Sequence, residues 1–313
     1  MTSFEKKHSF NFFLLTVLLI SFYIGGGQGG YNIFDDLVSK DIVGLICFFL
    51  ILTVGISHGS LDNTKGKRIL KLYKLKNISI FYLSYIFFAL TIVLVWVFLP
   101  SISLMLFLIV ASYHFGKEDS FLLNTDHKNN LYFFFRGLII ILAPLVFHTQ
   151  ETLEIFKTLL IKDNFLINSI IYLQNFYLLS ILMSLSILVC IFFYKHFKEL
   201  NLYGEILSIL GLNYFFDPLF AFTIYFCFLH SVRHSISLSC QLDKKNLKNG
   251  FKKFLDKALP LSLITALLFI LSLIFLLKYF VLSDALLKVI FIGLASLTFP
   301  HILLEYLVEK NGK

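Results

Sequence analysis

Charged residues are scarce in this sequence, and the apolar runs between them are long. Only 15% of the 313 residues are charged, whereas 58% are hydrophobic. A helix needs about 20 apolar residues to span a hydrocarbon core of roughly 30 Å, and such runs recur from residue 10 almost to the C-terminus. The composition therefore excludes an ordinary soluble domain and predicts a polytopic membrane protein.

Cysteine motifs and phosphate-binding loops are also missing. The four cysteines lie within apolar runs without CxxC spacing, so no disulfide framework is expected. The glycine-rich stretch 25–30 lacks the Lys-Ser/Thr ending and the preceding strand of a phosphate loop. Ser57, Ser112 and Ser231 lack the His and acid setting that activates a nucleophile. These absences argue against nucleotide-dependent and covalent catalysis.

Hydropathy and helix breakers predict an all-α, polytopic transmembrane helical bundle of about 8–10 helices. We expect one integral membrane domain over residues 1–313. The expected spans lie near residues 10–25, 41–60, 78–99, 101–116, 131–148, 169–194, 218–240, 258–281 and 284–307, with a weaker one at 202–216. The weaker segment is doubtful as a crossing because it is short and contains Glu205.

Much of the net charge of +8 lies in two lysine-rich segments, 65–76 and 244–257. The positive-inside rule predicts that both are cytoplasmic loops. If 202–216 crosses or re-enters the membrane, both segments and both termini are cytoplasmic, and we expect the protein in the cell inner membrane. No nucleic-acid-binding motif accompanies the charge, so we expect no nucleic acid partner.

Six of the nine histidines lie in or at the ends of apolar spans. An ionisable residue in hydrocarbon is costly and is therefore a candidate for function. Five of them fall at a similar depth on the predicted topology: His58, His114, His230, His234 and His301. Imidazole is a ligand for iron, zinc, copper and nickel. Five imidazoles at a shared depth therefore predict a metal site. His148, at the other end of its span, is expected to lie outside the site.

A four-residue spacing recurs around these histidines. It separates His230 from His234, which puts both rings on one helical face. The same interval separates three histidines from a following acid: His58 from Asp62, His114 from Glu118, and His301 from Glu305. Because a ligating His commonly donates its other N–H to a carboxylate, these acids are candidates for orienting the rings. Helix capping, or contact with loop lysines, is the alternative for the first two acids.

Arg233 lies deep in a span and requires an acidic partner. We expect that partner to be Asp62, Asp119 or Glu305.

Four segments resemble, in order, the motifs of the bacteriorhodopsin-related protein-like (Brp/Blh) family of β-carotene 15,15′-dioxygenases. They are Gly55–Asp62 (GISHGSLD), Ser112–Gly116 (SYHFG) with Asp119, Tyr225–His234 ending in HSVRH, and Phe299–His301 (FPH). Gly137, Pro144 and His148 resemble a further element, and the likeness covers residues 41–307. The chain departs from the family pattern at Ser57, where a proline is usual, and at Leu229, where an aromatic is frequent.

The resemblance implies that O₂ cleaves the central 15,15′ double bond of β-carotene into two molecules of all-trans-retinal. It implies iron(II), Fe(2+), held by His58, His114, His230 and His234. Five residues are expected to orient the ligands or the substrate: His301, Asp62, Glu118, Arg233 and Glu305. Expected partners are β-carotene, O₂ and the lipid bilayer, with a retinal-binding rhodopsin as product acceptor.

Two other functions use similar residues. A di-iron membrane desaturase or hydroxylase of carotenoid or lipid also clusters histidines, but requires repeated HxxxH and HxxHH boxes, whereas this chain has one HxxxH. A non-enzymatic metal or proton transporter would place the same histidines along a path.

Overall fold

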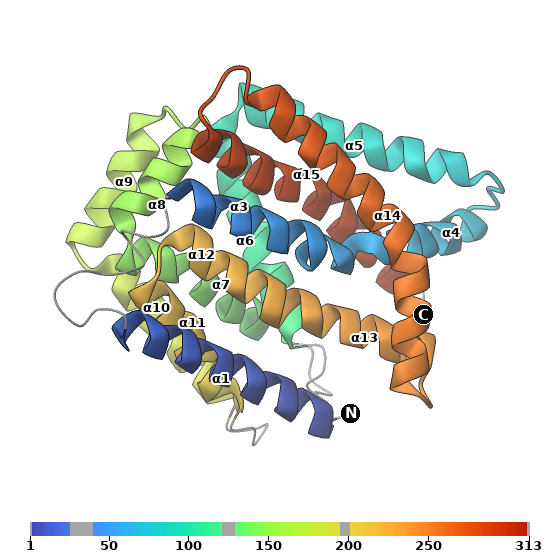
Figure 1. Cartoon of the computed structure of the whole chain (residues 1–313), viewed down its shortest axis with the longest axis horizontal. Helices are drawn as coiled ribbons and strands as arrows, with labels where there is room; N and C mark the ends of the chain where they lie inside the picture. Colours follow the sequence, from blue (N-terminus) through green and yellow to red (C-terminus); the bar gives the residue numbers. More distant parts are fainter. Residues whose placement is uncertain (1, 26–39, 121–128, 195–200, 312–313) are drawn as a thin grey trace.

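The computed structural model describes residues 2–25, 40–120, 129–194 and 201–311. Within these ranges every regular element is helical, which confirms the all-α prediction (Figure 1). The elements are α1 (Thr2–Gly25), α3 (Lys40–Thr53), η1 (Gly55–Leu61), α4 (Asp62–Leu72), α5 (Ile78–Phe98), α6 (Pro100–Asp119), α7 (Asn130–Phe147), α8 (Thr149–Thr158), α9 (Asn164–Asn175), α10 (Leu178–Tyr194), α11 (Asn201–Phe215), α12 (Pro218–Ile224), η2 (Tyr225–Ser231), α13 (Val232–Leu242), α14 (Leu247–Leu276) and α15 (Leu282–Asn311).

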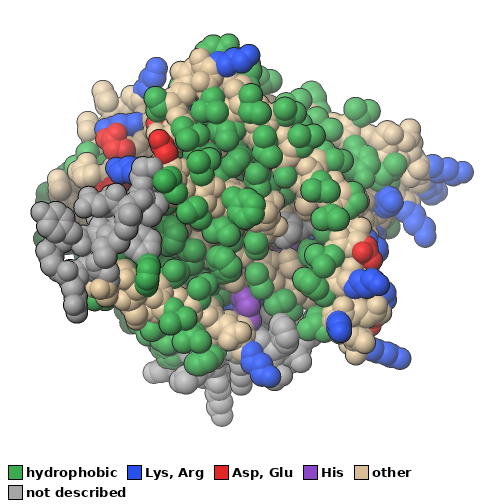
Figure 2. Space-filling model, in the orientation of Figure 1, with side chains coloured by type: hydrophobic (Ala, Val, Ile, Leu, Met, Phe, Trp, Pro, Cys, Tyr) green, Lys and Arg blue, Asp and Glu red, His purple; other side chains and the backbone are tan. Residues whose placement is uncertain are grey.

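Six helices in the described part of the chain are long and apolar enough to cross a membrane. They are α1 from Lys7, α5, α7, the continuous helix α12–η2–α13, α14 and α15. The pair α9 and α10 makes a seventh if it is one span bent by 71°. Hydrophobic side chains cover most of the face in Figure 2, as expected where helices meet lipid. The chain is therefore a multi-pass membrane protein.

Several predicted boundaries were wrong. The span expected over residues 41–60 ends at Thr53, and the 3₁₀ turn η1 follows it. The first lysine-rich segment, expected as a loop, is largely the amphipathic helix α4, which buries Gly66 and Leu70. The span expected over 169–194 breaks between α9 and α10, where Tyr177 has a φ of 57° that an α-helix cannot continue.

The two lysine-rich segments lie at the same end of the bundle. Figure 1 shows α4 and the turn between α13 and α14 on its right-hand side, together with the C-terminus. Figure 2 shows Lys and Arg side chains projecting there. This arrangement is what the positive-inside rule requires of two loops on one side of a membrane. The cytoplasmic location of that end stays a prediction, as does the crossing by α11, whose 15 residues span about 22 Å.

Helices α6 and α7 touch backbone to backbone at two glycines. A Cβ added to Gly116 would lie 1.7 Å from the carbonyl oxygen of Phe133, and one added to Gly137 would lie 1.8 Å from that of Ser112. Small residues permit this close approach of membrane helices. The contact fixes the last turn of α6, which carries acidic residues into the bundle.

Gly116→Ala should therefore force α6 and α7 apart and destabilise the protein by about 1–3 kcal/mol, the usual cost of overpacking. Thermal unfolding in detergent, followed by size-exclusion chromatography, measures the effect. Gly204→Ala is the matched control, because the nearest atom to its added Cβ lies 3.8 Å away. Equal unfolding temperatures for the two variants would refute the close contact.

Candidate metal centre

Four imidazoles from three segments of the bundle gather at one point. His114 comes from α6, His230 and His234 from the continuous helix η2–α13, and His301 from α15. The centroid of the His114 ring lies 5.5 Å from that of His230 and 5.4 Å from that of His301, and the His234 and His301 centroids lie 5.9 Å apart. All four residues are at most 3% exposed.

A π-helical turn, η2, presents His230 to this cluster. Such turns occur frequently at functional sites because they re-aim side chains within a helix. Aromatic rings enclose His230: Phe226 stacks on it with ring centroids 5.7 Å apart, and Phe115 meets it edge-on at 4.8 Å. These contacts keep the imidazole in one orientation and shield it from water.

Three of the imidazoles have a carboxylate at their Nδ1 atom. The pairs are His230 with Oδ1 of Asp119 at 3.0 Å, His234 with Oε2 of Glu118 at 2.6 Å, and His301 with Oδ1 of Asp62 at 2.8 Å. An ionised carboxylate can only accept a hydrogen bond, so Nδ1 carries the proton and Nε2 carries the lone pair. This is the tautomer that a metal-ligating histidine adopts when a carboxylate supports it.

These pairs differ from the predicted ones. Glu118 was expected beside His114, one turn away on α6, but it bonds to His234 across the bundle. Asp62 likewise bonds to His301. Both acids stand at the end of a helix, from where they reach a neighbouring helix instead of their own face. The proximity of His301 and Glu305 was predicted correctly: Nε2 lies 3.5 Å from Oε1.

Glu305 lies among the histidines. Its Oε2 atom is 3.9 Å from Nδ1 of His114, and its Oε1 atom accepts a hydrogen bond from Nζ of Lys65 at 2.6 Å. Burial lowers the pKa of Lys65 and the Glu305 carboxylate raises it, with a net rise above the ordinary value.

Two sets of donor atoms are close enough to hold a metal ion, each within 4.8 Å: His114, His301 and Glu305, and Glu118, His234 and Glu305. The buried histidines and glutamates can therefore bind a metal.

Two predicted positions do not contribute described contacts to the cluster. His148, as expected, lies elsewhere, with its side chain 22% exposed and 3.8 Å from Glu151. The side chain of His58 lies outside the part of the chain that the structure describes. Its role as a ligand therefore stays a prediction.

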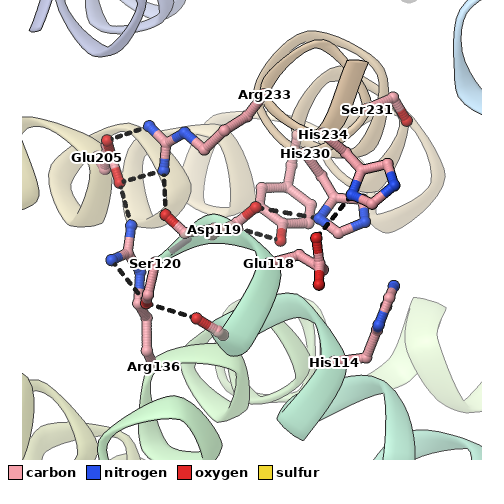
Figure 3. A network of polar contacts seen from close by, with 12 residues as sticks. His114, Glu118, Asp119, Ser120, Arg136, Glu205, His230, Ser231, Arg233 and His234 are labelled. Carbon is pink, nitrogen blue, oxygen red and sulfur yellow. Dashed lines mark hydrogen bonds and ion pairs between the residues drawn. The ribbon is translucent and has the colours of Figure 1, made fainter. Parts of the chain in front are cut away.

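The acidic partner of Arg233 is Glu205, which was not among the three predicted acids. Arg233 donates to Oε1 of Glu205 at 2.5 Å and to the backbone carbonyl of Asp119 at 2.7 Å. Arg136 donates to Oε2 of the same glutamate at 2.6 Å (Figure 3). Tyr225 donates to Oδ2 of Asp119 at 2.7 Å. Asp119, the support of His230, is thus held from several sides.

Sequence reasoning overlooked Arg136 and treated Glu205 only as an obstacle to a membrane crossing. The pairing could have been predicted from charge. An arginine within an apolar span needs a buried acid as its partner, and Glu205 is an acid within an apolar run. Spacing alone does not identify the pair, because the two residues are 69 positions apart.

An apolar cavity adjoins the cluster. Its lining includes Phe115 and Tyr225, which also contact His230. Its volume is about 90 Å³, below the roughly 300 Å³ at which small-molecule pockets usually begin. Its walls must therefore move when a large ligand enters.

A family model described as β-carotene 15,15′-dioxygenase matches residues 49–309. The chain belongs to this family. A β-carotene 15,15′-dioxygenase from an uncultured marine bacterium, 66A03, is 29% identical over 273 residues, which cover 84% of this chain and 93% of that protein. No solved structure matches the chain. The family match includes every residue of the histidine cluster and its carboxylates, whereas α1 lies before it.

Glu205→Ala should cost about 3–5 kcal/mol of stability, because it leaves two buried arginines without their shared anion. The unfolding midpoint in detergent measures this loss. Glu154→Ala is the control. The Glu154 side chain, which forms an ion pair with Lys157, is 68% exposed, and removing such a surface pair costs about 0–1 kcal/mol of stability. Equal midpoints would contradict the ion network.

Proposed function

We propose that this chain uses O₂ to cleave the central 15,15′ double bond of β-carotene, giving two molecules of all-trans-retinal, with iron(II) held by the clustered histidines. The family match supports the reaction. The observation that carries the site is the set of three buried imidazoles whose Nδ1 atoms each face a carboxylate.

The proposed ligands are His114, His230, His234 and His301, with His58 as a further candidate from its motif. His301 is included because its ring has the same carboxylate support as His230 and His234. We choose iron because imidazoles bind it and because, when bound, it supplies the redox chemistry that activates O₂.

The balance of charge around the cluster supports a divalent cation. The ionisable side chains in and beside it are five carboxylates, Asp62, Glu118, Asp119, Glu205 and Glu305, and three cations, Lys65, Arg136 and Arg233. With neutral imidazoles this set carries two net negative charges. Excess charge in low-dielectric surroundings is costly, and one Fe²⁺ would neutralise it.

The residues of the chain position and shield the reacting groups. Asp119, Glu118 and Asp62 hold the imidazoles, while Phe115 and Phe226 exclude water from His230. The reaction breaks one carbon–carbon double bond, and each carbon gains one of the two oxygen atoms of O₂. It needs no external reductant and no net proton transfer, so the site requires no general acid.

β-Carotene is a hydrocarbon that dissolves in the bilayer, so a site between membrane helices receives it without a passage through water. We place the protein in the inner membrane with both termini cytoplasmic, as the lysine-rich segments predict. A retinal-binding rhodopsin as product acceptor is proposed from the family resemblance alone.

Expression of the chain in a bacterial host that makes β-carotene should bleach the cells and produce retinal, measured by chromatography of extracted pigments. His148→Ala should retain the activity, and His230→Ala should lose at least 100-fold of it, because the change removes a proposed ligand. Unchanged β-carotene despite confirmed membrane expression and available iron would contradict the proposed activity.

A further inference from the structure

The apolar cavity follows one face of α6 away from the histidines. Five residues of this helix line it, in the i, i+3, i+4, i+7, i+11 pattern of one helical face: Leu104, Phe107, Leu108, Ala111 and Phe115. Such intervals place side chains in one row. The eleven helical steps from Leu104 to Phe115 extend about 16 Å along the helix axis. His114, in the metal cluster, is adjacent to the last of them.

The two ends of the cavity differ. At one end Phe115 and Tyr225 contact His230. At the other, α6 begins beside Trp96, whose fully buried indole donates from Nε1 to the backbone carbonyl of Leu159 at 3.0 Å. Its ring centroid lies 6.1 Å from that of Phe107. The hydrogen bond and the packing fix the indole, so this end has a rigid wall.

The lining presents almost only hydrocarbon to a ligand. The polar side chains of the lining direct their donors elsewhere: Nδ2 of Asn213 donates to the carbonyl of Ile209 at 2.8 Å, and Oγ1 of Thr152 donates to that of His148 at 2.7 Å. The Tyr225 hydroxyl donates to Asp119, and the Trp96 indole donates to Leu159. Placing a polar ligand group here without partners would be unfavourable. The chemistry suits an unsubstituted polyene with an apolar ring.

We propose that this cavity receives one half of the carotenoid, with the terminal ring at the Trp96 end, and that its depth selects the double bond to be cleaved. This inference rests on the proposed function. The row of lining residues along α6 is comparable in length to one extended half of β-carotene. Once the side walls have moved apart to admit the polyene, a ring against the Trp96 wall brings the central bond to the histidines.

The same chemistry at a different bond would give different products. If the polyene slides deeper into the cavity, another of its double bonds reaches the site. Each carbon of that bond then gains one oxygen atom from O₂. The products are then two aldehydes of unequal length instead of two retinals. Product lengths therefore report the position of the substrate.

The test deepens the far end of the cavity and measures products. Leu104→Ala and Phe156→Ala remove side chains that line it. The iron-loaded, purified variants are incubated with β-carotene and O₂, and the aldehydes are identified by chromatography and mass spectrometry. We expect the fraction of unequal-length aldehydes to rise at least tenfold over the unmodified protein. The control is Leu106→Ala, on the same helix but 51% exposed, which should give retinal only.

A second variant fills the cavity. Ala111→Phe should lower co-purification of β-carotene with the iron-free protein at least fivefold, a binding measurement that does not depend on turnover. Retinal as the sole product of both deepened variants, or full β-carotene binding by Ala111→Phe, would overturn the inference. If the unmodified protein forms no retinal, the proposed function itself fails, and the inference fails with it.

Discussion

The hydrogen bond between a buried imidazole and a carboxylate is the interaction on which this site depends. It fixes the tautomer of His230, His234 and His301, but it also places ionised acids inside a membrane bundle, where an uncompensated charge is expensive. Other features follow from that cost. Lys65 meets Glu305, and Arg233 holds the backbone of Asp119 while sharing Glu205 with a second arginine.

The helices are arranged so that these contacts are possible. The glycine contact between α6 and α7 holds the last turn of α6, from which Glu118 and Asp119 reach α13 and η2. The π-helical turn then orients His230 toward Asp119. Helix α1, outside the family match, joins the same network: Ser9 donates to Glu205 and accepts from Arg233. One network of hydrogen bonds and ion pairs thus connects the candidate metal centre to the helices packed around it.

Sequence alone predicted the fold class and the gathering of His114, His230, His234 and His301, because hydropathy and depth depend on composition along each span. The pairing of acids with histidines could not be derived from i to i+4 spacing, since Asp62 and Glu118 reach across to other helices. Helix α4 and the break after Thr53 were missed for a similar reason. Both depend on tertiary contacts that local hydropathy does not contain.

Iron analysis of histidine variants tests the central claim most directly. Protein purified without oxygen and supplied with iron(II) should bind one equivalent. His114→Ala, His230→Ala, His234→Ala and His301→Ala should each retain less than a tenth of that iron while remaining folded, because each removes one proposed ligand. His148→Ala should bind as much as the unmodified protein. An iron-free His148 variant together with an iron-loaded His234 variant would contradict the account.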